Sequence, residues 1–166
     1  MATSNNLNGK TICITGASSG IGQAIAQHLG SSGAHVFMMG RNRSPMDESA
    51  GLIRSAGGSA DVATFDVADL EALSSWVASA ASSTGRLDVM VNNAGFGDVG
   101  ATIADGDPAI WKAMLETNVL ALAVGCQAAI KAMRSTSSQG NIINISSVAA
   151  LQRESGVYGA TKHAVN

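Results

Sequence analysis

The chain has 166 residues, of which 46% are hydrophobic and 13% charged, and its formal net charge is −2 at pH 7. This length and apolar content suit a single domain with a buried core, so we predict one domain over residues 1–166. Scattered lysine and arginine residues form no basic stripe. Their distribution argues against a nucleic-acid or membrane-surface partner and favours a small-molecule partner.

The N-terminal residues 1–8 are polar and uncharged, and they lack the basic flank and apolar stretch of a secretory signal. We expect no later apolar run to be long enough to cross a bilayer, and therefore predict a cytoplasmic protein. Cys13 falls in an apolar run and Cys126 in an apolar helical pattern. Both are expected to be buried packing groups, with no disulfide and no metal site.

The first predicted strand, residues 11–14, runs directly into a glycine-rich segment. Gly16 can adopt backbone angles that a side chain forbids, Gly20 lets the main chain approach a pyrophosphate, and Gly22 lets the next helix pack on the strand. The N–H groups at the start of that helix would face the anion. An ordinary turn is the alternative, because Gly and Ser are common in turns. The predicted nucleotide-binding residues are Gly16, Ser18, Ser19, Gly20, Ile21 and Gly22.

Apolar runs then alternate with helical patterns along the chain. Strands that alternate with helices predict crossover connections and a parallel sheet, and the many small residues suit helices packed on both of its faces. The predicted fold is therefore α/β, a doubly wound parallel sheet with about five strands. Further strands are predicted at residues 35–39, 62–65, 87–91 and 142–145, and helices over residues 20–32 and after the capping pair Asp107 and Pro108.

Ligands of such sheets bind beyond the carboxyl ends of the strands, so the residues that follow each predicted strand are candidates for a site. On chemistry alone, Asp66 and Asn92 are equally suited to capping a strand end. The candidates after the second to fifth strands are residues 40–43, Asp66 and Val67, residues 92–95, and Ser146 and Ser147.

Tyr158 and Lys162 lie four residues apart in a predicted helix, and this spacing places both side chains on one face. A lysine cation near a phenol favours the phenolate, so such a pair can transfer a proton. The alternative is a surface tyrosine beside a solvated lysine.

Several of these segments, taken in order, resemble the short-chain dehydrogenase/reductase family over residues 9–166. They are the glycine-rich turn, Asn92-Asn93-Ala94-Gly95, Asn118, the serine pair, and Tyr158-Gly-Ala-Thr-Lys162. The resemblance implies a Rossmann-type fold and an oxidoreductase that interconverts a small-molecule carbonyl and an alcohol by hydride transfer with a nicotinamide cofactor. It also implies that a complete chain forms a homo-oligomer.

The resemblance implies roles for four catalytic residues. Tyr158 would donate or accept the proton, and Lys162 would favour its ionised form and hold the nicotinamide ribose. Ser147 would bind the reacting oxygen, with Ser146 as the alternative; a one-residue slip on a strand reverses the face, and the family pattern favours the second serine. Asn118 would position a water molecule, the alternative being an amide that bonds neighbouring backbone within a core.

Further residues would contact the cofactor by the same resemblance. Asp66, with Val67 beside it, would contact the adenine side. Asn92, Ala94 and Gly95 would shape the cofactor wall.

The choice of dinucleotide depends on charge. A carboxylate after the second strand would bind the ribose hydroxyls of NAD, but Gly40 occupies that position. Arg41 is placed to bind a 2′-phosphate, with Arg43 as a helper, so NADP(H) is preferred. NAD(H) stays possible because Ser18 and Ser19 stand where many NADP-preferring relatives carry a basic residue.

The sequence stops at Asn166, inside the predicted helix of Tyr158 and Lys162, whereas the family continues with further strands and helices. We therefore expect the N-terminal part of a longer enzyme, and little or no turnover by the 166-residue chain alone. The alternative is a non-catalytic short form that binds nucleotide or pairs with a full-length relative. An epimerase or dehydratase, which would use the same tyrosine and lysine, is a third interpretation.

Overall fold

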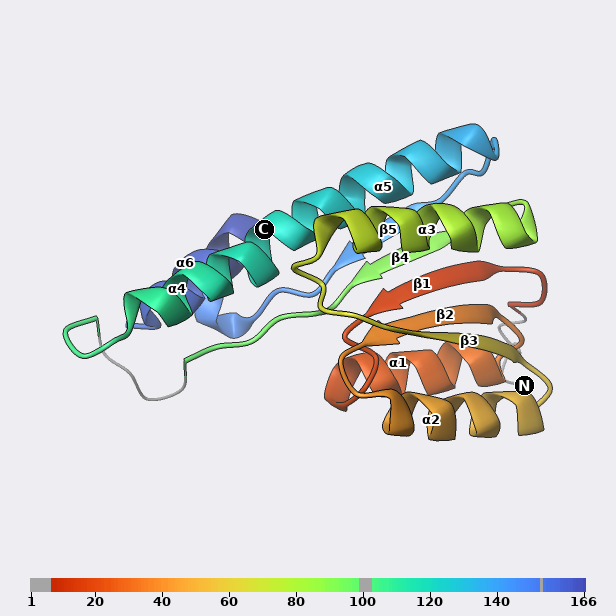
Figure 1. Cartoon of the computed structure of the whole chain (residues 1–166), viewed down its shortest axis with the longest axis horizontal. Coiled ribbons are helices and arrows are strands. Elements are labelled where there is room, and N and C mark those ends of the chain that lie inside the picture. The colour runs from red at the N-terminus through yellow and green to blue at the C-terminus, as the bar shows by residue number, and fades with distance from the viewer. Residues whose placement is uncertain (1–6, 99–102, 153) are drawn as a thin grey trace.

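The computed structural model describes residues 7–98, 103–152 and 154–166. They form a five-stranded parallel sheet in the order β3-β2-β1-β4-β5, with helices on both faces (Figure 1). The strands are β1 Thr11–Thr15, β2 His35–Gly40, β3 Ser59–Thr64, β4 Val89–Asn92 and β5 Asn141–Asn144. The helices are α1 Gly20–Ser31, α2 Arg43–Ser55, α3 Leu70–Thr84, α4 Pro108–Leu115, α5 Ala121–Ser135 and α6 Gly156–Val165, with a π-helical turn η1 at Glu116–Leu120 and a 3₁₀ turn η2 at Val148–Leu151. This architecture confirms the predicted fold class.

The central strands are apolar on both faces because helices cover both. Ile12 and Ile14 of β1 lie in the core under α1 and α2, whereas Cys13 between them lies in the core under α3 and α5. Val36 and Phe37 of β2 divide in the same way. Successive side chains of a strand point to opposite faces, so a doubly covered strand requires a continuous apolar run.

The bounds of β3 differ from the predicted strand. The structure starts β3 at Ser59, which pairs with His35, and ends it at Thr64, whereas the apolar run suggested residues 62–65. Because β3 is an edge strand, exposed residues such as Ser59 and Asp61 are tolerated within it. The apolar run therefore marks only the later part of this edge strand.

The helical stretch Pro108–Ser135 combines α4, η1 and α5. It has 28 residues, and the mean hydropathy of its most apolar segment is 1.5, so by length and composition alone it could cross a membrane. This corrects the expectation that no run is long enough. The buried residues Ala129 and Met133 of α5 belong to the core between this helix, α3 and the sheet (Figure 1), and 33% of the most apolar segment is buried.

The buried residue Asp88 links the amino ends of three strands, β1, β4 and β5, through its carboxylate and its backbone carbonyl. The Asp88 carboxylate accepts hydrogen bonds from the Thr11 N–H at 2.9 Å, from the Lys10 ammonium at 3.0 Å, and from two nitrogens of Arg86 at 2.7 and 2.6 Å. The Asp88 carbonyl accepts from the N–H of Asn141. Burial acts to raise the pKa of Asp88, but the hydrogen bonds from Arg86, Thr11 and Lys10 outweigh it, so the pKa lies below its ordinary value.

We expect the substitution D88N to lower the free energy of unfolding by about 1–3 kcal/mol at pH 7, since the charge-assisted hydrogen bonds are lost. A lowered pKa stabilises the fold above the unfolded carboxyl pKa of about 3.9, and this contribution disappears as the pH falls through the lower folded value. The difference between D88N and the unsubstituted chain should therefore shrink below about pH 4.

Urea unfolding followed by circular dichroism at several pH values measures this difference. D47N serves as the control, because Asp47 forms an exposed pair with Arg43 one helical turn away and should change stability by no more than about 0.5 kcal/mol. Equal losses in both variants would contradict the assigned role of Asp88.

Candidate active site

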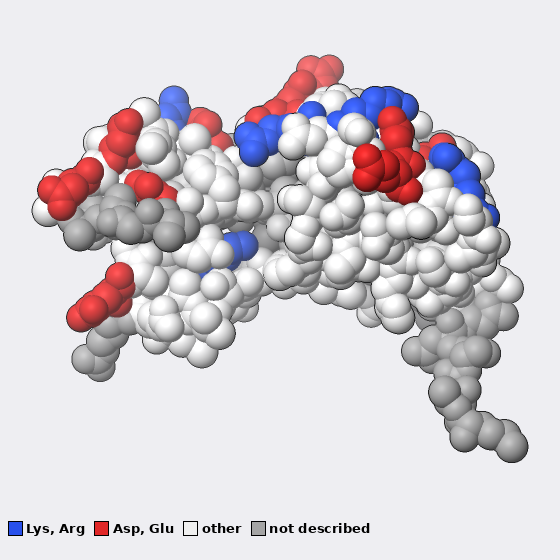
Figure 2. All heavy atoms as spheres, turned by 90° about the horizontal axis from the view of Figure 1, so that it is seen from below, with Lys and Arg blue, Asp and Glu red and all other residues white. Residues whose placement is uncertain are grey.

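The carboxyl ends of the strands surround a cavity of about 710 Å³, a volume typical of ligand sites. Seen from below, the molecule is hollowed between its left and right parts, and basic side chains lie in and beside the hollow (Figure 2). Most of the predicted site residues line this cavity: Gly16, Ser18, Ser19, Gly20, Ile21, Arg41, Asp66, Val67, Ala94, Gly95, Ser147, Tyr158 and Lys162. Gly22, Asn92 and Asn118 are not among the lining residues.

The glycine-rich turn fits tightly against the segment that follows β4. Gly16 has φ +67°, and a Cβ atom there would lie 2.9 Å from the Cα atom of Ala94. A Cβ atom on Gly22 would overlap the Asn93 amide and the carbonyl of Gly16. Gly22 therefore acts behind the cavity wall, where its lack of a side chain lets α1 start close to β1.

The start of α1 presents backbone donors to the cavity. Ser19 is the N-cap residue, and Ser18, Ser19 and Gly20 all line the cavity. The first N–H groups of a helix have no carbonyl partner within the helix, and its dipole is positive at this end. This part of the cavity can therefore hold an anion such as a phosphate.

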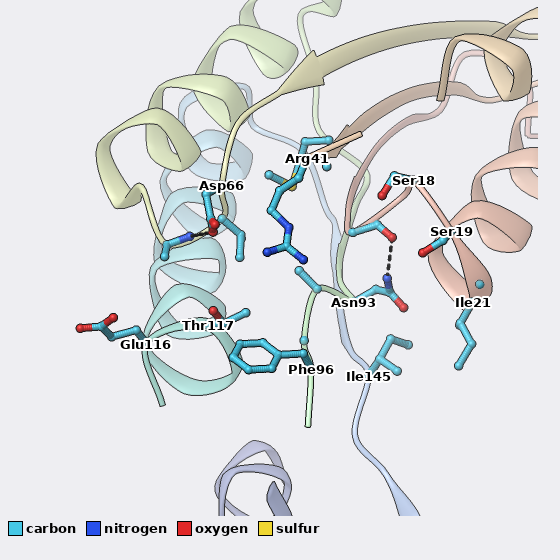
Figure 3. A pocket seen from close by; sticks show the side chains of 18 of the residues that line it. Ser18, Ser19, Ile21, Arg41, Asp66, Asn93, Phe96, Glu116, Thr117 and Ile145 are labelled. Carbon is cyan, nitrogen blue, oxygen red and sulfur yellow. Dashed lines mark hydrogen bonds between the residues drawn. The ribbon is translucent and has the colours of Figure 1, made fainter. Parts of the chain in front are cut away.

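Arg41 supplies the charge next to the glycine-rich turn. In Figure 3 its side chain extends from the end of β2 into the cavity, between Asp66 on one side and Ser18 on the other. Arg43 instead donates to Asp47 on α2 at 3.0 Å and does not line the cavity. Of the two predicted phosphate ligands, the structure thus places only Arg41 at the site.

Asp66 caps the segment in which it lies and also lines the cavity. Its carboxylate accepts the N–H of Ala68 at 3.0 Å, and its carbonyl accepts the N–H of Asp69 at 2.8 Å. The two alternatives for Asp66, a cap and a ligand contact, therefore do not exclude each other.

Asn92 and Asn93 point in different directions. The Asn92 amide donates to Asn144 at 2.9 Å and to the sulfur of Cys126 at 3.3 Å, between α5 and β5, so its side chain lies away from the cavity. Asn93 lines the cavity instead (Figure 3), and its amide donates to the Thr15 carbonyl at 2.9 Å. Contrary to the expectation, Asn92 does not line the cavity and its neighbour Asn93 does, because the Asn92 amide is held by Asn144 and Cys126.

The two cysteines differ in burial. Cys13 is fully buried in β1, and burial raises the pKa of its thiol. Cys126 is only half-buried and takes part in hydrogen bonds with Asn92 and Asn144. The expectation of a buried packing group therefore holds for Cys13 and not fully for Cys126.

Tyr158 and Lys162 lie on one face of α6, at the opposite end of the cavity from Arg41. The Lys162 ammonium lies 5.9 Å from the centre of the Tyr158 ring and donates to the Ile145 carbonyl at 2.9 Å. Lys162 is buried, and burial lowers its pKa. Gly97 packs against the Tyr158 ring, since a Cβ atom there would lie 2.9 Å from the ring carbon Cδ2. The ring is thus held beside a lysine withdrawn from water.

Both serines that follow β5 line the cavity. Ser146 donates to the backbone carbonyl of Lys162 at 3.0 Å, and Ser147 caps η2 by accepting the N–H of Ala149 at 3.2 Å. They lie beyond the last strand residue, Asn144, so the alternation of a strand does not separate their faces. Both serines thus line the cavity, and Ser147 stays the predicted residue with Ser146 as its alternative.

Asn118 lies behind the cavity in the π-helical turn η1, where it is 1% exposed. Its amide donates to the Phe96 carbonyl at 2.8 Å and to the Thr161 hydroxyl at 3.0 Å, while its carbonyl accepts the Phe96 N–H at 3.0 Å. These contacts correspond to the alternative interpretation of Asn118, an amide that bonds neighbouring backbone within a core. Single π-helical turns inside α-helices occur frequently at functional sites.

Several residues that line the cavity were not among the candidates expected directly after the predicted strands. Ile145 and Phe65 directly precede the predicted candidates Ser146 and Asp66, and both could have been found by including the residue before each candidate. Glu116 and Thr117 lie in η1 and line the cavity because of how this helical stretch packs, for which the sequence carries no local signal.

We expect G22A to destabilise the protein by about 1–3 kcal/mol, because the added methyl group would meet the backbone of the glycine-rich turn. G51A is the matched control, since Gly51 lies in α2 and a Cβ atom there would have no neighbouring atom within 4 Å. An alanine there should stabilise the helix by about 0.5–1 kcal/mol. Urea unfolding of the two variants measures both values, and a G22A variant as stable as G51A would show that the tight approach is not required.

Comparisons with known proteins agree with this geometry. The model of the short chain dehydrogenase family matches residues 10–166. Glucose 1-dehydrogenase 2 of Bacillus subtilis (strain 168) is 36% identical over 144 residues, which cover 86% of this chain and 56% of the relative. The chain thus spans little more than half the length of that relative.

Solved structures share the fold at a similar level of identity. A metagenomic short-chain oxidoreductase in complex with NADP is 35% identical with a TM-score of 0.89, and the match covers 98% of this chain and 74% of that one. An NAD⁺-bound xylitol dehydrogenase is 28% identical, also with a TM-score of 0.89, over 97% of this chain and 62% of that one. With the family match over nearly all of its residues, the chain belongs to the short-chain dehydrogenase family of oxidoreductases.

Proposed function

We propose that this chain binds NADP(H), and that the protein that carries it interconverts a carbonyl and an alcohol, with Tyr158 as the proton donor or acceptor. One observation carries the proposal: the glycine-rich turn, Arg41 and the Tyr158–Lys162 pair line a single cavity. The anion-binding end and the proton-transfer end are therefore open to one elongated ligand. Predictions made from the sequence that belong to the same proposal are a single domain over residues 1–166, a cytoplasmic location and a homo-oligomer.

The residues at the first end of the cavity fit a dinucleotide. The N-terminus of α1 would hold the pyrophosphate, because Gly16 and Gly20, both with positive φ, leave room for close approach. No carboxylate stands at Gly40, where it would repel a 2′-phosphate, and Arg41 extends into the cavity beside it. The metagenomic relative was solved with NADP and the xylitol dehydrogenase with NAD⁺. Arg41 is the reason for which we propose NADP(H) for this chain.

The residues at the other end fit proton transfer. A bound nicotinamide supplies or accepts the hydride at the substrate carbon. Tyr158 would exchange a proton with the substrate oxygen, and the Lys162 ammonium beside its ring would stabilise the phenolate. Ser147 would donate a hydrogen bond to the same oxygen, because it lines the cavity. Asn118 would hold the segment around Phe96 in place from behind.

We expect R41A to weaken NADPH binding by about 10–100-fold, because one charge-assisted contact with the 2′-phosphate is lost. The affinity for NADH should stay within about threefold of that of the unsubstituted chain. R43A is the matched control, since Arg43 pairs with Asp47 outside the cavity. Titration of the unsubstituted chain, R41A and R43A, followed by NADPH and NADH fluorescence, gives the six dissociation constants. An equal loss for both nucleotides would contradict the proposed preference.

We expect Y158F to reduce carbonyl reduction by at least about 10²-fold, because the proton donor is removed. The affinity for NADPH should change little, since the substitution keeps the aromatic ring and removes only one hydroxyl group from the cavity wall. Turnover is measured on the longest natural protein that contains this sequence, and binding on the same protein. Unchanged turnover in Y158F would rule out the proton-transfer role, whatever its effect on binding.

A further inference from the structure

The Thr161 hydroxyl lies at the centre of a buried hydrogen-bond chain between two walls of the cavity. It accepts from the Asn118 amide at 3.0 Å and donates to the backbone carbonyl of Tyr158 at 2.7 Å. Asn118 in turn holds both the N–H and the carbonyl of Phe96. The chain therefore runs from the segment after β4, through η1, into α6.

Burial makes this chain of hydrogen bonds costly to break. Thr161 is 0% exposed and Asn118 is 1% exposed, so water cannot replace a lost partner without a rearrangement. Both N–H groups of the Asn118 amide are used, one by Phe96 and one by Thr161. Removing the Thr161 hydroxyl would thus leave a buried donor without a partner.

The helix that carries the reacting groups depends on such contacts. α6 has ten residues, fewer than the roughly 12–15 at which isolated helices become marginally stable. Its position must therefore come from tertiary contacts. On its inner side these include the Ser146 bond to the Lys162 carbonyl and the Thr161 bond to Asn118.

We propose that Thr161 is a positioning residue, whose hydroxyl fixes α6 against Asn118 and thereby sets where Tyr158 and Lys162 lie relative to Phe96. The catalytic meaning of this placement rests on the proposed function, but the placement itself does not. Thr161 lies between Tyr158 and Lys162 in the chain and acts through Asn118, which lies behind the wall.

The test compares three variants of this chain. T161V removes the hydroxyl and keeps the shape of the side chain, T161S restores the hydroxyl, and T84V removes a half-buried hydroxyl that bonds the carbonyls of Ala80 and Arg86 at the far end of α3. Residue-resolved amide hydrogen exchange reports on Phe96, whose N–H is bound by Asn118. Tyr158 is the only tyrosine of the chain, so 3-fluorotyrosine labelling gives a single ¹⁹F resonance that reports on its ring.

In T161V we expect about tenfold faster exchange at Phe96 and in α6, and a displaced or broadened ¹⁹F resonance. T161S should return both signals to those of the unsubstituted chain, and T84V should change neither. If T161V does not fold, T161A removes the same hydroxyl without the second methyl group and is compared with T161S in the same way. The proposal would be overturned if T161V, like T84V, left both the exchange at Phe96 and the fluorine signal unchanged. It would also be overturned if T161S behaved like T161V.

An NADPH titration of the unsubstituted chain separates this proposal from the proposed function. A chain that does not bind NADPH contradicts the cofactor assignment, while the exchange comparison still decides the role of Thr161. A chain that binds NADPH, but in which T161V changes neither exchange nor the fluorine signal, contradicts only the role of Thr161.

Discussion

The close approach of the glycine-rich turn to the segment after β4 is the contact on which the site depends. The Thr15 hydroxyl accepts the N–H groups of Asn93 and Ala94, both at 3.0 Å, and the Asn93 amide returns hydrogen bonds to the carbonyls of Thr15 and Gly16. These bonds tie the end of β1 to the end of β4. Because the turn then starts α1, they also set the position of the helix N-terminus that faces the cavity. Side chains on Gly16 or Gly22 would push the two segments apart.

The two ends of the cavity are held by different physical means. At the end lined by the glycine-rich turn, backbone geometry dominates, since strand pairing and the turn place the backbone N–H groups that start α1. At the other end, Tyr158 and Lys162 belong to a short helix that side-chain hydrogen bonds hold in place. A single substitution can remove one of the side-chain contacts that hold α6. At the end lined by the glycine-rich turn the sensitive positions are glycines, because a side chain added at Gly16 or Gly22 would collide with backbone.

Two residues show why a structural and a functional interpretation of one position can both apply. Asp66 caps the backbone of its own segment while it lines the cavity. Asn118 bonds neighbouring backbone within a buried network, yet that network joins the Phe96 segment to the helix of Tyr158. A residue can thus hold the shape of a cavity wall without lining the cavity itself. Asn118 acts in this way by holding the Phe96 segment against α6.

The sequence by itself determined the parallel α/β fold and the identity of most cavity residues, because apolar runs that alternate with helical patterns predict parallel strands, and the ends of parallel strands meet at one edge. It placed Asn92 rather than Asn93 at the cavity wall, since the direction of a side chain depends on where a strand ends, and that is set by pairing with its neighbours. Only the tertiary structure showed that Asn118 and Thr161 meet, because 43 residues separate them in the chain. Their contact exists because the π-helical turn and α6 pack together, and no local pattern in either segment encodes the other.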